Sequence, residues 1–372
     1  MNNYSIAIIG GGIAGSASAL RAAQNGLDTI WFLGSKQTRK RSRSQWVANV
    51  DNMIGLHDGI VKDQVTKVLK KNKLGEAAEI VEKSHFDINN RLIIKNTVER
   101  IQAGYPNVRI IEEEISSIEK IDDNFLLKSP DNNYNSESVV LATGVMDEQP
   151  FIIKPDKTGN PVESEKWIYP FANREQVLYC IRCEGHLTRD EVVAIIGYSN
   201  IAAELAMMLH ERFGVKGYIL ANGKPIDISE ERRTLLHHYD IEIVENPITD
   251  IISDGAKQLH GFSFDTRDDI LVRFALVSLG LFRVYNDLAR QVGARLMDEG
   301  LPDEKRHIWI NHKSESSVHN FFVVGDAVKR EDEPVMKQIY TAQEYAVRAV
   351  DTIDNRRRKV LRDNILDNKK PQ

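Results

Sequence analysis

The feature that most constrains the fold is a glycine pattern near the start of the chain. The apolar run Ile6–Ile9 is followed by Gly10, Gly12 and Gly15, spaced as Gly-x-Gly-x-x-Gly, and then by small, helix-compatible residues. In a strand-turn-helix unit the first glycine permits the tight turn, the second lets a pyrophosphate approach the backbone, and the third lets the helix pack on the strand. The helix N-terminus then presents free N–H groups to the phosphates. We therefore predict a Rossmann-type dinucleotide-binding domain.

The strand that should follow this helix lacks one expected residue. It is predicted over residues 28–33, after Gly26 ends the helix. The acidic residue that a classical NAD site carries at the end of this strand is replaced by Leu33-Gly34-Ser35-Lys36. This weakens a classical NAD interpretation of the first site. The segment 36–43 that follows is basic; a solvated loop is the simpler interpretation, and contact with an acidic ligand or partner is the alternative.

A second strand-turn-helix pattern, at residues 192–205, echoes the first. It predicts an internal repeat and a second domain of the nucleotide-binding type. Ser199 replaces the second glycine, so a side chain stands where a pyrophosphate needs bare backbone. The expected fold class is α/β, with two Rossmann-like, three-layer nucleotide-binding domains, the second inserted into the first.

The domain boundaries follow from composition and patterning. We expect a first dinucleotide-binding-type domain in two parts, residues 1–165 and 279–355, around a second domain at 166–278 that carries both cysteines. The Pro- and Gly-containing stretch 149–170 is the expected linker. Residues 356–372 form a charged tail that is expected to fray. Helices are predicted over residues 60–74, 92–103 and 335–353.

The composition excludes several classes of function. A hydrophobic content of 42% and a charged content of 28% are ordinary for a soluble protein. The net charge of −5 gives no reason to expect nucleic acid as the main partner, because such proteins usually carry a basic domain. The chain has no run of about 18 uncharged apolar residues, so no membrane span is expected. The N-terminus lacks signal-peptide features and two thiols suit a reducing compartment, so the expected location is the cytoplasm.

Both cysteines of the 372 residues stand in one motif, Cys180-Ile181-Arg182-Cys183. We interpret the pair as redox-active. The alternatives are packing, since buried free Cys behaves as a small hydrophobe, and half of a zinc site. No second Cys-x-x-Cys or His-x-x-His follows at metal spacing, so no metal is expected. The reactive species of such a pair is a thiolate, whose pKa falls near a cation; Arg182 either supplies that field or points to solvent.

Taken together, these pieces resemble the low-molecular-weight thioredoxin reductase family of two-domain flavoproteins over about residues 5–353. The segment 180–185, just before the second repeat, resembles the family's Cys-x-x-Cys-Asp-Gly, and the first glycine pattern resembles its FAD-binding glycines. Other positions match shorter family motifs: Asn52 in a Glu-Asn-x-Pro-Gly-like segment at 51–55 with Ile54 in place of proline, Thr143 and Gly144 in Ala-Thr-Gly, Gly325 and Asp326 in Gly-Asp, and Gln338 in the place of Arg-Gln-Ala.

The resemblance implies an FAD-dependent disulfide oxidoreductase and a homodimer. The motif positions above would bind the cofactor, with Asp326 contacting the ribityl chain. Cys180 would attack the disulfide of a thioredoxin-like protein or a small substrate, and Cys183 would face the flavin. Glu184 takes the place of the family's acid, which protonates the leaving thiolate, and His186 is an alternative proton carrier. The plainer alternatives are a surface carboxylate and a structural histidine.

The chain departs from the family where NADPH would bind. The family's arginine-rich segment, which grips the 2′-phosphate, is replaced by residues 221–227, Ala-Asn-Gly-Lys-Pro-Ile-Asp, and Arg232 and Arg233 come later. With Ser199 in the loop as well, we expect a second domain that binds NAD(P)H poorly. A ferredoxin-type donor or an oxygen-using dithiol oxidase is then possible; the alternatives are an NAD(P)H-dependent reductase with an unorthodox site and a non-enzymatic flavin-bound redox sensor. Inserted residues near 76–104 and before Cys180 could serve a different donor or partner.

Overall fold

The structure is a computed structural model that describes residues 3–40, 42–47, 50, 52–84, 88–155, 157–255 and 257–367. The chain divides into two compact units. Residues 1–45, 91–146 and 281–372 form the first unit, and residues 46–90 and 147–280 form the second. The second unit thus starts at Asp147, earlier than the residue 166 that we predicted for its main segment, and it also takes in residues 46–90.

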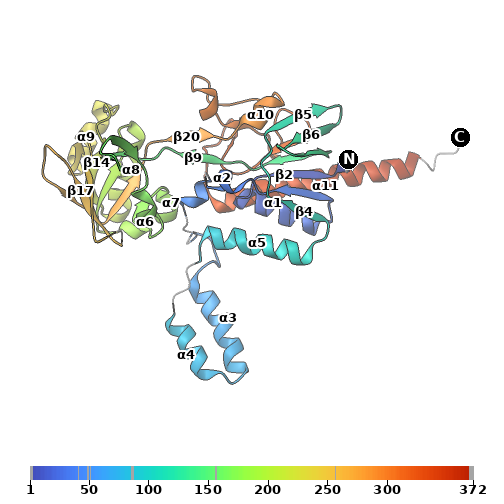
Figure 1. The fold of residues 1–372 in the computed structure, drawn as a ribbon, viewed down its shortest axis with the longest axis horizontal. Helices are drawn as coiled ribbons and strands as arrows, with labels where there is room; N and C mark the ends of the chain where they lie inside the picture. Colours follow the sequence, from blue (N-terminus) through green and yellow to red (C-terminus); the bar gives the residue numbers. More distant parts are fainter. Residues whose placement is uncertain are drawn as a thin grey trace. The chain divides into compact units, whose positions relative to one another are not determined.

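The first unit is built on a parallel sheet whose strands come from distant parts of the chain (Figure 1). Its order is β22-β8-β2-β3-β4, and every pairing is parallel. The strands are short apolar runs that are mostly buried on both faces, which is typical of parallel sheets. Their bounds are β2 (Ile6–Ile9), β3 (Thr29–Phe32), β4 (Val108–Ile111), β8 (Val139–Leu141) and β22 (Phe321–Val323).

Helices cover one face of this sheet and a second sheet covers the other. The helices α1 (Ile13–Gln24), α5 (Asn90–Gly104) and α11 (Ile339–Asp367) bury residues such as Ala19, Ile101 and Val350 against it. On the other face, Phe32 and Phe125 share a core with Phe321. The second sheet has the order β1-β7-β6-β5, from β1 (Asn3–Tyr4), β5 (Ser117–Ile121), β6 (Asn124–Lys128) and β7 (Asn133–Ser136).

The second unit repeats this plan. Its parallel sheet has the order β12-β19-β13-β14-β15, with the helices α8 (Asn200–Phe213) and α9 (Glu230–His238) packed on it. The central strand is again the one before the turn-helix pattern, so the predicted repeat and fold class are confirmed. The bounds are β12 (Val177–Leu178), β13 (Val192–Ile196), β14 (Lys216–Leu220), β15 (Ile241–Val244) and β19 (Phe274–Val277), with a smaller antiparallel sheet of β16 (Asp250–Ser253), β17 (Leu259–Ser263) and β18 (Ile270–Leu271).

Two expectations about irregular segments were wrong. The predicted linker 149–170 contains an antiparallel hairpin of β10 (Ile152–Pro155) and β11 (Pro161–Ser164), followed by α6 (Ile168–Ala172). The predicted frayed tail is helical as far as Asp367, because Arg356 pairs with Glu315 at 2.5 and 2.7 Å and holds the helix to the first unit. An Asp354–Arg358 pair at 2.9 Å, four residues apart, supports the same turn.

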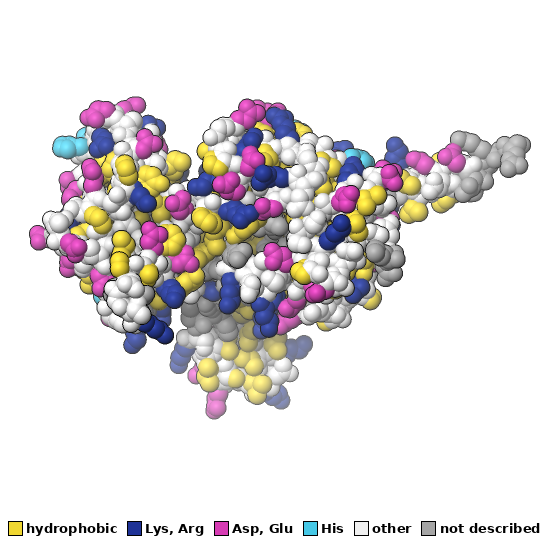
Figure 2. Space-filling model, turned by 45° about the horizontal axis from the view of Figure 1, so that its top comes forward, with side chains coloured by type: hydrophobic (Ala, Val, Ile, Leu, Met, Phe, Trp, Pro, Cys, Tyr) yellow, Lys and Arg dark blue, Asp and Glu magenta, His cyan; other side chains and the backbone are white. Residues whose placement is uncertain are grey.

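The two ends of the segment 46–90, which belongs to the second unit, lie close together. Trp46 is buried, with its ring stacked on Tyr169 at a centroid distance of 4.5 Å, and the Asn90 side chain donates to the Val47 carbonyl. Between these ends lies a helical hairpin of α3 (Asp58–Lys71) and α4 (Gly75–Lys83). Its exposed apolar side chains show in Figure 2; they include Ile60, Val65, Val68, Leu74 and Ile80.

The shorter elements complete the described chain. They are α2 (Lys36–Arg39), α7 (Ile181–Glu184), α10 (Asp287–Gln291), β9 (Val145–Asp147), β20 (Leu281–Val284), β21 (Ile308–Trp309) and β23 (Val328–Lys329), and the 3-10 helices η1 (Arg43–Gln45), η2 (Gly185–Thr188) and η3 (Asp303–Lys305). None of the described helices is long and apolar enough to cross a membrane. Arg41 of the basic segment and Asp51 of the motif around Asn52 lie outside the described residues.

Candidate active site

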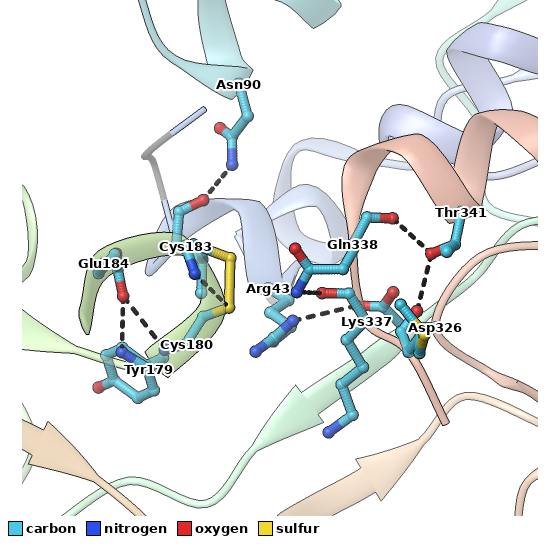
Figure 3. Close-up of a disulfide and its surroundings, with 12 residues drawn as sticks. Arg43, Asn90, Tyr179, Cys180, Cys183, Glu184, Asp326, Lys337, Gln338 and Thr341 are labelled. Carbon is cyan, nitrogen blue, oxygen red and sulfur yellow. Dashed lines mark hydrogen bonds and ion pairs between the residues drawn. A yellow bond between two sulfur atoms is a disulfide. The ribbon is translucent and has the colours of Figure 1, made fainter. Parts of the chain in front are cut away.

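The two cysteines form a disulfide in the second unit, at the turn between β12 and α7 (Figure 3). Their Cα atoms are 5.3 Å apart, and the residues are only 8% and 7% exposed. Cys180 is the N-cap of α7, and its Sγ accepts the N–H of Cys183 at 3.2 Å. A sulfur held at the start of a helical turn and facing backbone N–H groups is stabilised as a thiolate when the disulfide is reduced. The redox interpretation fits this geometry.

A glycine lets the turn sit against the next helix. A Cβ added at Gly185 would lie 2.9 Å from Cγ1 of Ile181 and 3.1 Å from Cε2 of Phe213. Phe213 belongs to α8, so a side chain at position 185 would require the Ile181 and Phe213 side chains to shift. The glycine after the Cys-x-x-Cys-acid motif thus allows close packing of this turn on α8.

Glu184 is buried directly behind the disulfide turn, with 2% of the residue exposed. Its Oε2 accepts the backbone N–H groups of Tyr179 at 3.0 Å and Cys180 at 3.1 Å (Figure 3). The alternative of a surface carboxylate is therefore wrong. Two amide donors stabilise an ionised carboxylate, whereas a proton donor must be protonated. Through these two hydrogen bonds the Glu184 carboxylate holds the backbone of Tyr179 and Cys180 in place after β12. Its role as an acid stays a prediction.

The other polar residues of the motif face outward. Arg182 and His186 are both exposed. The exposure of Arg182 agrees with the solvent-facing alternative, and the role of His186 as a proton carrier stays a prediction.

An aromatic group next to the disulfide was missed by sequence reasoning. The hydroxyl of Tyr179 donates to Oε1 of Gln149 at 2.5 Å, and burial, with Asp147 and Glu184 nearby, raises the pKa of Tyr179 well above its usual value. The phenol therefore stays neutral and keeps its donor role. The Trp46 ring lies 6.2 Å from that of Tyr179. Nothing in the local sequence around Trp46 signals this contact.

The first glycine loop, in the first unit, behaves as its spacing predicts. A Cβ at Gly10, where φ is +129°, would lie 2.3 Å from the Ala142 carbonyl oxygen, and a Cβ at Gly15 would lie 1.9 Å from the oxygen of Gly10. Both are close approaches to backbone atoms that only glycine, which lacks a Cβ atom, allows. At Gly12, the N-cap of α1, no described atom lies within 4 Å of the added Cβ. The N-terminus of α1 therefore presents backbone that no described side chain covers at Gly12.

The Gly-Asp motif and the start of α11 form the other end of the predicted cofactor site. Gly325 has φ +82°, and a Cβ there would lie 2.9 Å from Cβ of Ala14 at the start of α1. The next residue, Asp326, pairs with Arg43 through Oδ2 and Nη1 at 3.4 Å. Gln338 is buried immediately before α11, and its side-chain amide donates to the Lys337 carbonyl at 2.9 Å (Figure 3).

The remaining predicted cofactor residues have structural contacts. The Thr143 hydroxyl donates to the Tyr285 carbonyl at 2.6 Å, and the Gly144 carbonyl accepts the Tyr285 N–H at 3.0 Å. Gly144 has φ +69° and no described atom within 4 Å of an added Cβ. Asn52 belongs to the second unit, unlike the other predicted cofactor residues.

The second loop, between β13 and α8, is covered by the chain itself. The N–H of Asp227 donates to the Tyr198 carbonyl at 2.7 Å, and Ser199 and Asp227 form an isolated β-bridge. Oδ1 of Asn200 accepts the Ser229 N–H at 2.8 Å. The segment after β14 is therefore tied across the turn in which a dinucleotide domain exposes its amides.

The later arginines are engaged elsewhere. Arg232 donates to Oε1 of Glu204 at 2.8 Å and to the Ser229 hydroxyl at 3.2 Å. Arg233 donates to the Ile228 carbonyl at 3.1 Å. Two nitrogen donors of Arg232 and one of Arg233 therefore already have partners within the second unit.

Comparison with known proteins places this geometry in a family. The family model described as "Pyridine nucleotide-disulphide oxidoreductase" matches residues 4–346. No curated protein sequence matches the chain.

The structure is similar to solved structures at low identity. Thioredoxin reductase from Streptococcus pyogenes MGAS5005 has a TM-score of 0.68 and 18% identity, with 94% of this chain and 96% of that chain covered. Thioredoxin reductase from Giardia duodenalis has a TM-score of 0.67 and 17% identity, with 95% and 99% covered. The structure of HlmI has a TM-score of 0.70 and 15% identity, with 98% and 95% covered.

At such identities the similarity shows the fold, and the family model, which spans most of the chain, shows the family. The chain belongs to the pyridine nucleotide-disulphide oxidoreductase family, as a flavin-dependent oxidoreductase with the two-domain fold of the thioredoxin reductases.

Proposed function

We propose that this enzyme exchanges electron pairs between FAD and a disulfide or dithiol substrate through Cys180 and Cys183. The observation that carries the proposal is the buried disulfide at the start of α7 in a chain of this family. A thioredoxin-like protein is the first candidate substrate, because solved thioredoxin reductases share the fold. A small disulfide or dithiol is the second candidate.

FAD is the cofactor that the family implies, and the first unit fits it. Gly12 offers bare backbone to the pyrophosphate at the N-terminus of α1, where the first turn contains no acidic residue. Asp326 and Gln338 stand at the positions that the family resemblance assigns to the ribityl chain and the ring. When bound, FAD supplies the two-electron chemistry that a disulfide needs.

Electrons, protons and leaving groups of the thiol–disulfide exchange are all accounted for by FAD, the two cysteines and the substrate. Two electrons and two protons convert the Cys180–Cys183 disulfide to a dithiol. The thiolate of Cys180 then attacks one sulfur of the substrate disulfide and forms a mixed disulfide, and one substrate thiolate leaves. Cys183 attacks Cys180, the second substrate thiolate leaves, and the intramolecular disulfide forms again. The same steps run in reverse for a dithiol substrate, in which case FAD takes up the electrons.

The proposal does not assign NAD(P)H as the usual donor. Ser199, the segment 227–229 tied across the turn, and the engaged arginines all oppose binding of a phosphorylated dinucleotide. A ferredoxin-type protein is the proposed alternative donor, and oxygen is the proposed acceptor if the enzyme runs as a dithiol oxidase. An NAD(P)H-dependent reductase with an unorthodox site is the rival proposal.

The assembly and location are also proposals. The family resemblance suggests a homodimer, which analytical ultracentrifugation of the flavin-loaded protein would test. Free thiols in the working cycle suit a reducing compartment such as the cytoplasm.

Replacing one cysteine tests the central proposal. Cys180→Ser should retain the yellow flavin and lose disulfide reduction by at least about 1000-fold, because serine is not a comparable nucleophile. The measurement is single-turnover reduction of a thioredoxin-like disulfide after anaerobic photoreduction of the flavin. Cys183→Ser is the matched control, which should trap the mixed disulfide with Cys180. Full activity of Cys180→Ser would remove the proposal, and no turnover of the native enzyme with any disulfide would favour a redox sensor.

Anaerobic mixing decides the donor. Native enzyme mixed with NADPH or NADH should keep its flavin absorbance for many seconds, whereas a reduced ferredoxin should bleach it. Rapid bleaching by either nicotinamide would reject the proposed donor and leave the thiol chemistry unaffected.

A further inference from the structure

One residue of the basic segment joins the cofactor end of the first unit. Arg43 lies in η1, and its Nη1 is 3.4 Å from Oδ2 of Asp326, 283 positions later in the chain (Figure 3). The side chains are 14% and 21% exposed. The other described pairing in this segment is different, because Arg39 donates to Glu112 at 2.9 Å on the exposed surface.

We propose that Arg43 is a positioning residue of the FAD site that acts through Asp326. By holding Oδ2, the guanidinium orients this carboxyl group and leaves Oδ1 to accept a hydroxyl of the ribityl chain. The proposal rests on FAD as the cofactor and not on the disulfide chemistry.

The backbone around Asp326 is held by its neighbours, so the conformation that FAD binding must still fix is that of the Asp326 side chain. Gly325 adopts a conformation that favours glycine and lies against Ala14, and the following residues form β23. Fixing a free carboxylate when the ligand arrives costs conformational entropy, which a partner bound beforehand removes. Arg43 is such a partner.

The charge balance gives the second argument. FAD brings a diphosphate, and a half-buried aspartate adds another negative charge to the same site. The two negative groups repel each other, and a cation held beside the carboxylate reduces that repulsion. Arg43 is the one cation that the described residues place within ion-pair distance of Asp326.

A double-mutant cycle on FAD affinity tests the proposal. Apoprotein is titrated with FAD and binding is followed by flavin fluorescence. Arg43→Gln and Asp326→Asn should each weaken binding by about 10-fold, the value of a charge-assisted hydrogen bond. The double variant should be no weaker than Asp326→Asn alone by more than about 2-fold, since both changes break one unit. Arg43→Lys should recover part of the loss, because lysine keeps the positive charge but not the planar, multiple-donor guanidinium group.

Arg39→Gln is the matched control, since it removes the same charge from the same segment. It should change FAD affinity by less than about 2-fold, because exposed pairs contribute little. Equal losses for Arg39→Gln and Arg43→Gln would assign the effect to general charge and overturn the proposal. Additive losses in the double variant, or native affinity of Arg43→Gln, would also overturn it. If Arg43→Gln apoprotein does not fold, Arg43→Lys with and without Asp326→Asn completes the cycle.

Discussion

The two units are both built on a five-stranded parallel sheet but differ at the turn that follows the central strand. The central strands β2 and β13 both lead through a glycine into a helix, α1 and α8. In the first unit the turn leaves bare backbone at Gly12 with no described atom over it. In the second unit the corresponding turn carries Ser199 and is bridged to Asp227.

The comparison shows that the second unit keeps the glycine that packing requires but not the glycine that a pyrophosphate would approach. Gly197 remains, because a Cβ there would lie 2.7 Å from the Ser278 carbonyl oxygen and 2.8 Å from Cβ of Ala202. That glycine serves the contact of helix and sheet. The position that would serve only a pyrophosphate has changed to Ser199. Packing therefore accounts for Gly197, and weak phosphate binding at the second turn stays a prediction.

The largest expected effect comes from placing the same side chain at both turns. Gly12→Glu should fold, because the added Cβ meets no described atom. Its carboxylate would fill the phosphate space and repel the diphosphate, so FAD affinity should fall by about 100-fold or more. Ser199→Glu should leave the flavin content and the absence of rapid nicotinamide reduction unchanged. The measurement is flavin absorbance per mole of protein after gel filtration.

Loss of flavin in both variants would mean that the second turn also supports the cofactor, and retention in both would mean that the first turn does not hold the pyrophosphate. Gly26→Ala, in which a Cβ also meets no described atom but φ is +70°, controls for ordinary backbone strain. It should reduce thermal stability by about 1 kcal/mol without loss of flavin.

A smaller effect separates the units by pH. Burial alone would raise the pKa of Glu315 and Asp351, but hydrogen bonds from Arg356 and Arg21 lower both below their usual values. Both pairs lie in the first unit. A carboxyl group whose folded-state pKa is lowered contributes stability above its unfolded pKa, and this is lost as pH falls through the folded pKa. In the second unit, the described carboxyl group with a lowered pKa is Asp250, whose pair with Lys154 is exposed.

Acid below about pH 4.5 should therefore destabilise the first unit before the second. Denaturant titrations at pH 6 and pH 4, with flavin release as the signal for the first unit, would measure this. Arg356→Met should cost about 2 kcal/mol at pH 6 and less at pH 4, because it removes the guanidinium that makes two hydrogen bonds to the buried Glu315 carboxylate. Lys154→Met is the matched control and should cost less than about 0.5 kcal/mol at either pH. Equal costs for the two variants would contradict the assignment.

The sequence was sufficient where the physical signal is local. Runs such as Ile6–Ile9 and Val192–Ile196 are strands because parallel sheets bury both faces, and that pattern is readable in a few residues. The hairpin at 152–164 also had local signals, namely branched residues around the turn Gly159-Asn160, but proline and glycine content favoured a linker. The charged tail was read as frayed because its composition does not show Glu315, the distant residue that holds Arg356.

The parts of the site that could not be predicted depend on distant partners. Glu184 was identified by its place in the motif, yet its burial and its two amide donors follow from how β12 approaches α7. The contact of Arg43 with Asp326 spans 283 positions, and no periodicity or spacing connects them. The tie across the second turn belongs to the same class, because its bonded partners are 28 or 29 positions apart in the chain.

The smallest expected effect tests whether that tie is what excludes nicotinamide. The double variant Ser199→Gly, Asn200→Ala restores the missing glycine and removes the side-chain acceptor of the Ser229 N–H. Loss of one such hydrogen bond is worth about 1 kcal/mol, so NADPH affinity should rise by no more than about 5-fold. The backbone bond between Asp227 and Tyr198 remains, and Arg232 stays paired with Glu204.

Stopped-flow reduction of the flavin by NADPH and NADH gives the measurement. A gain of 100-fold would mean that the tie alone closed a working site. A small gain that grows for NADPH over NADH when Glu204→Ala is added would assign the remaining deficit to the pairing of Arg232, because that change removes the acceptor of the Arg232 Nε–H.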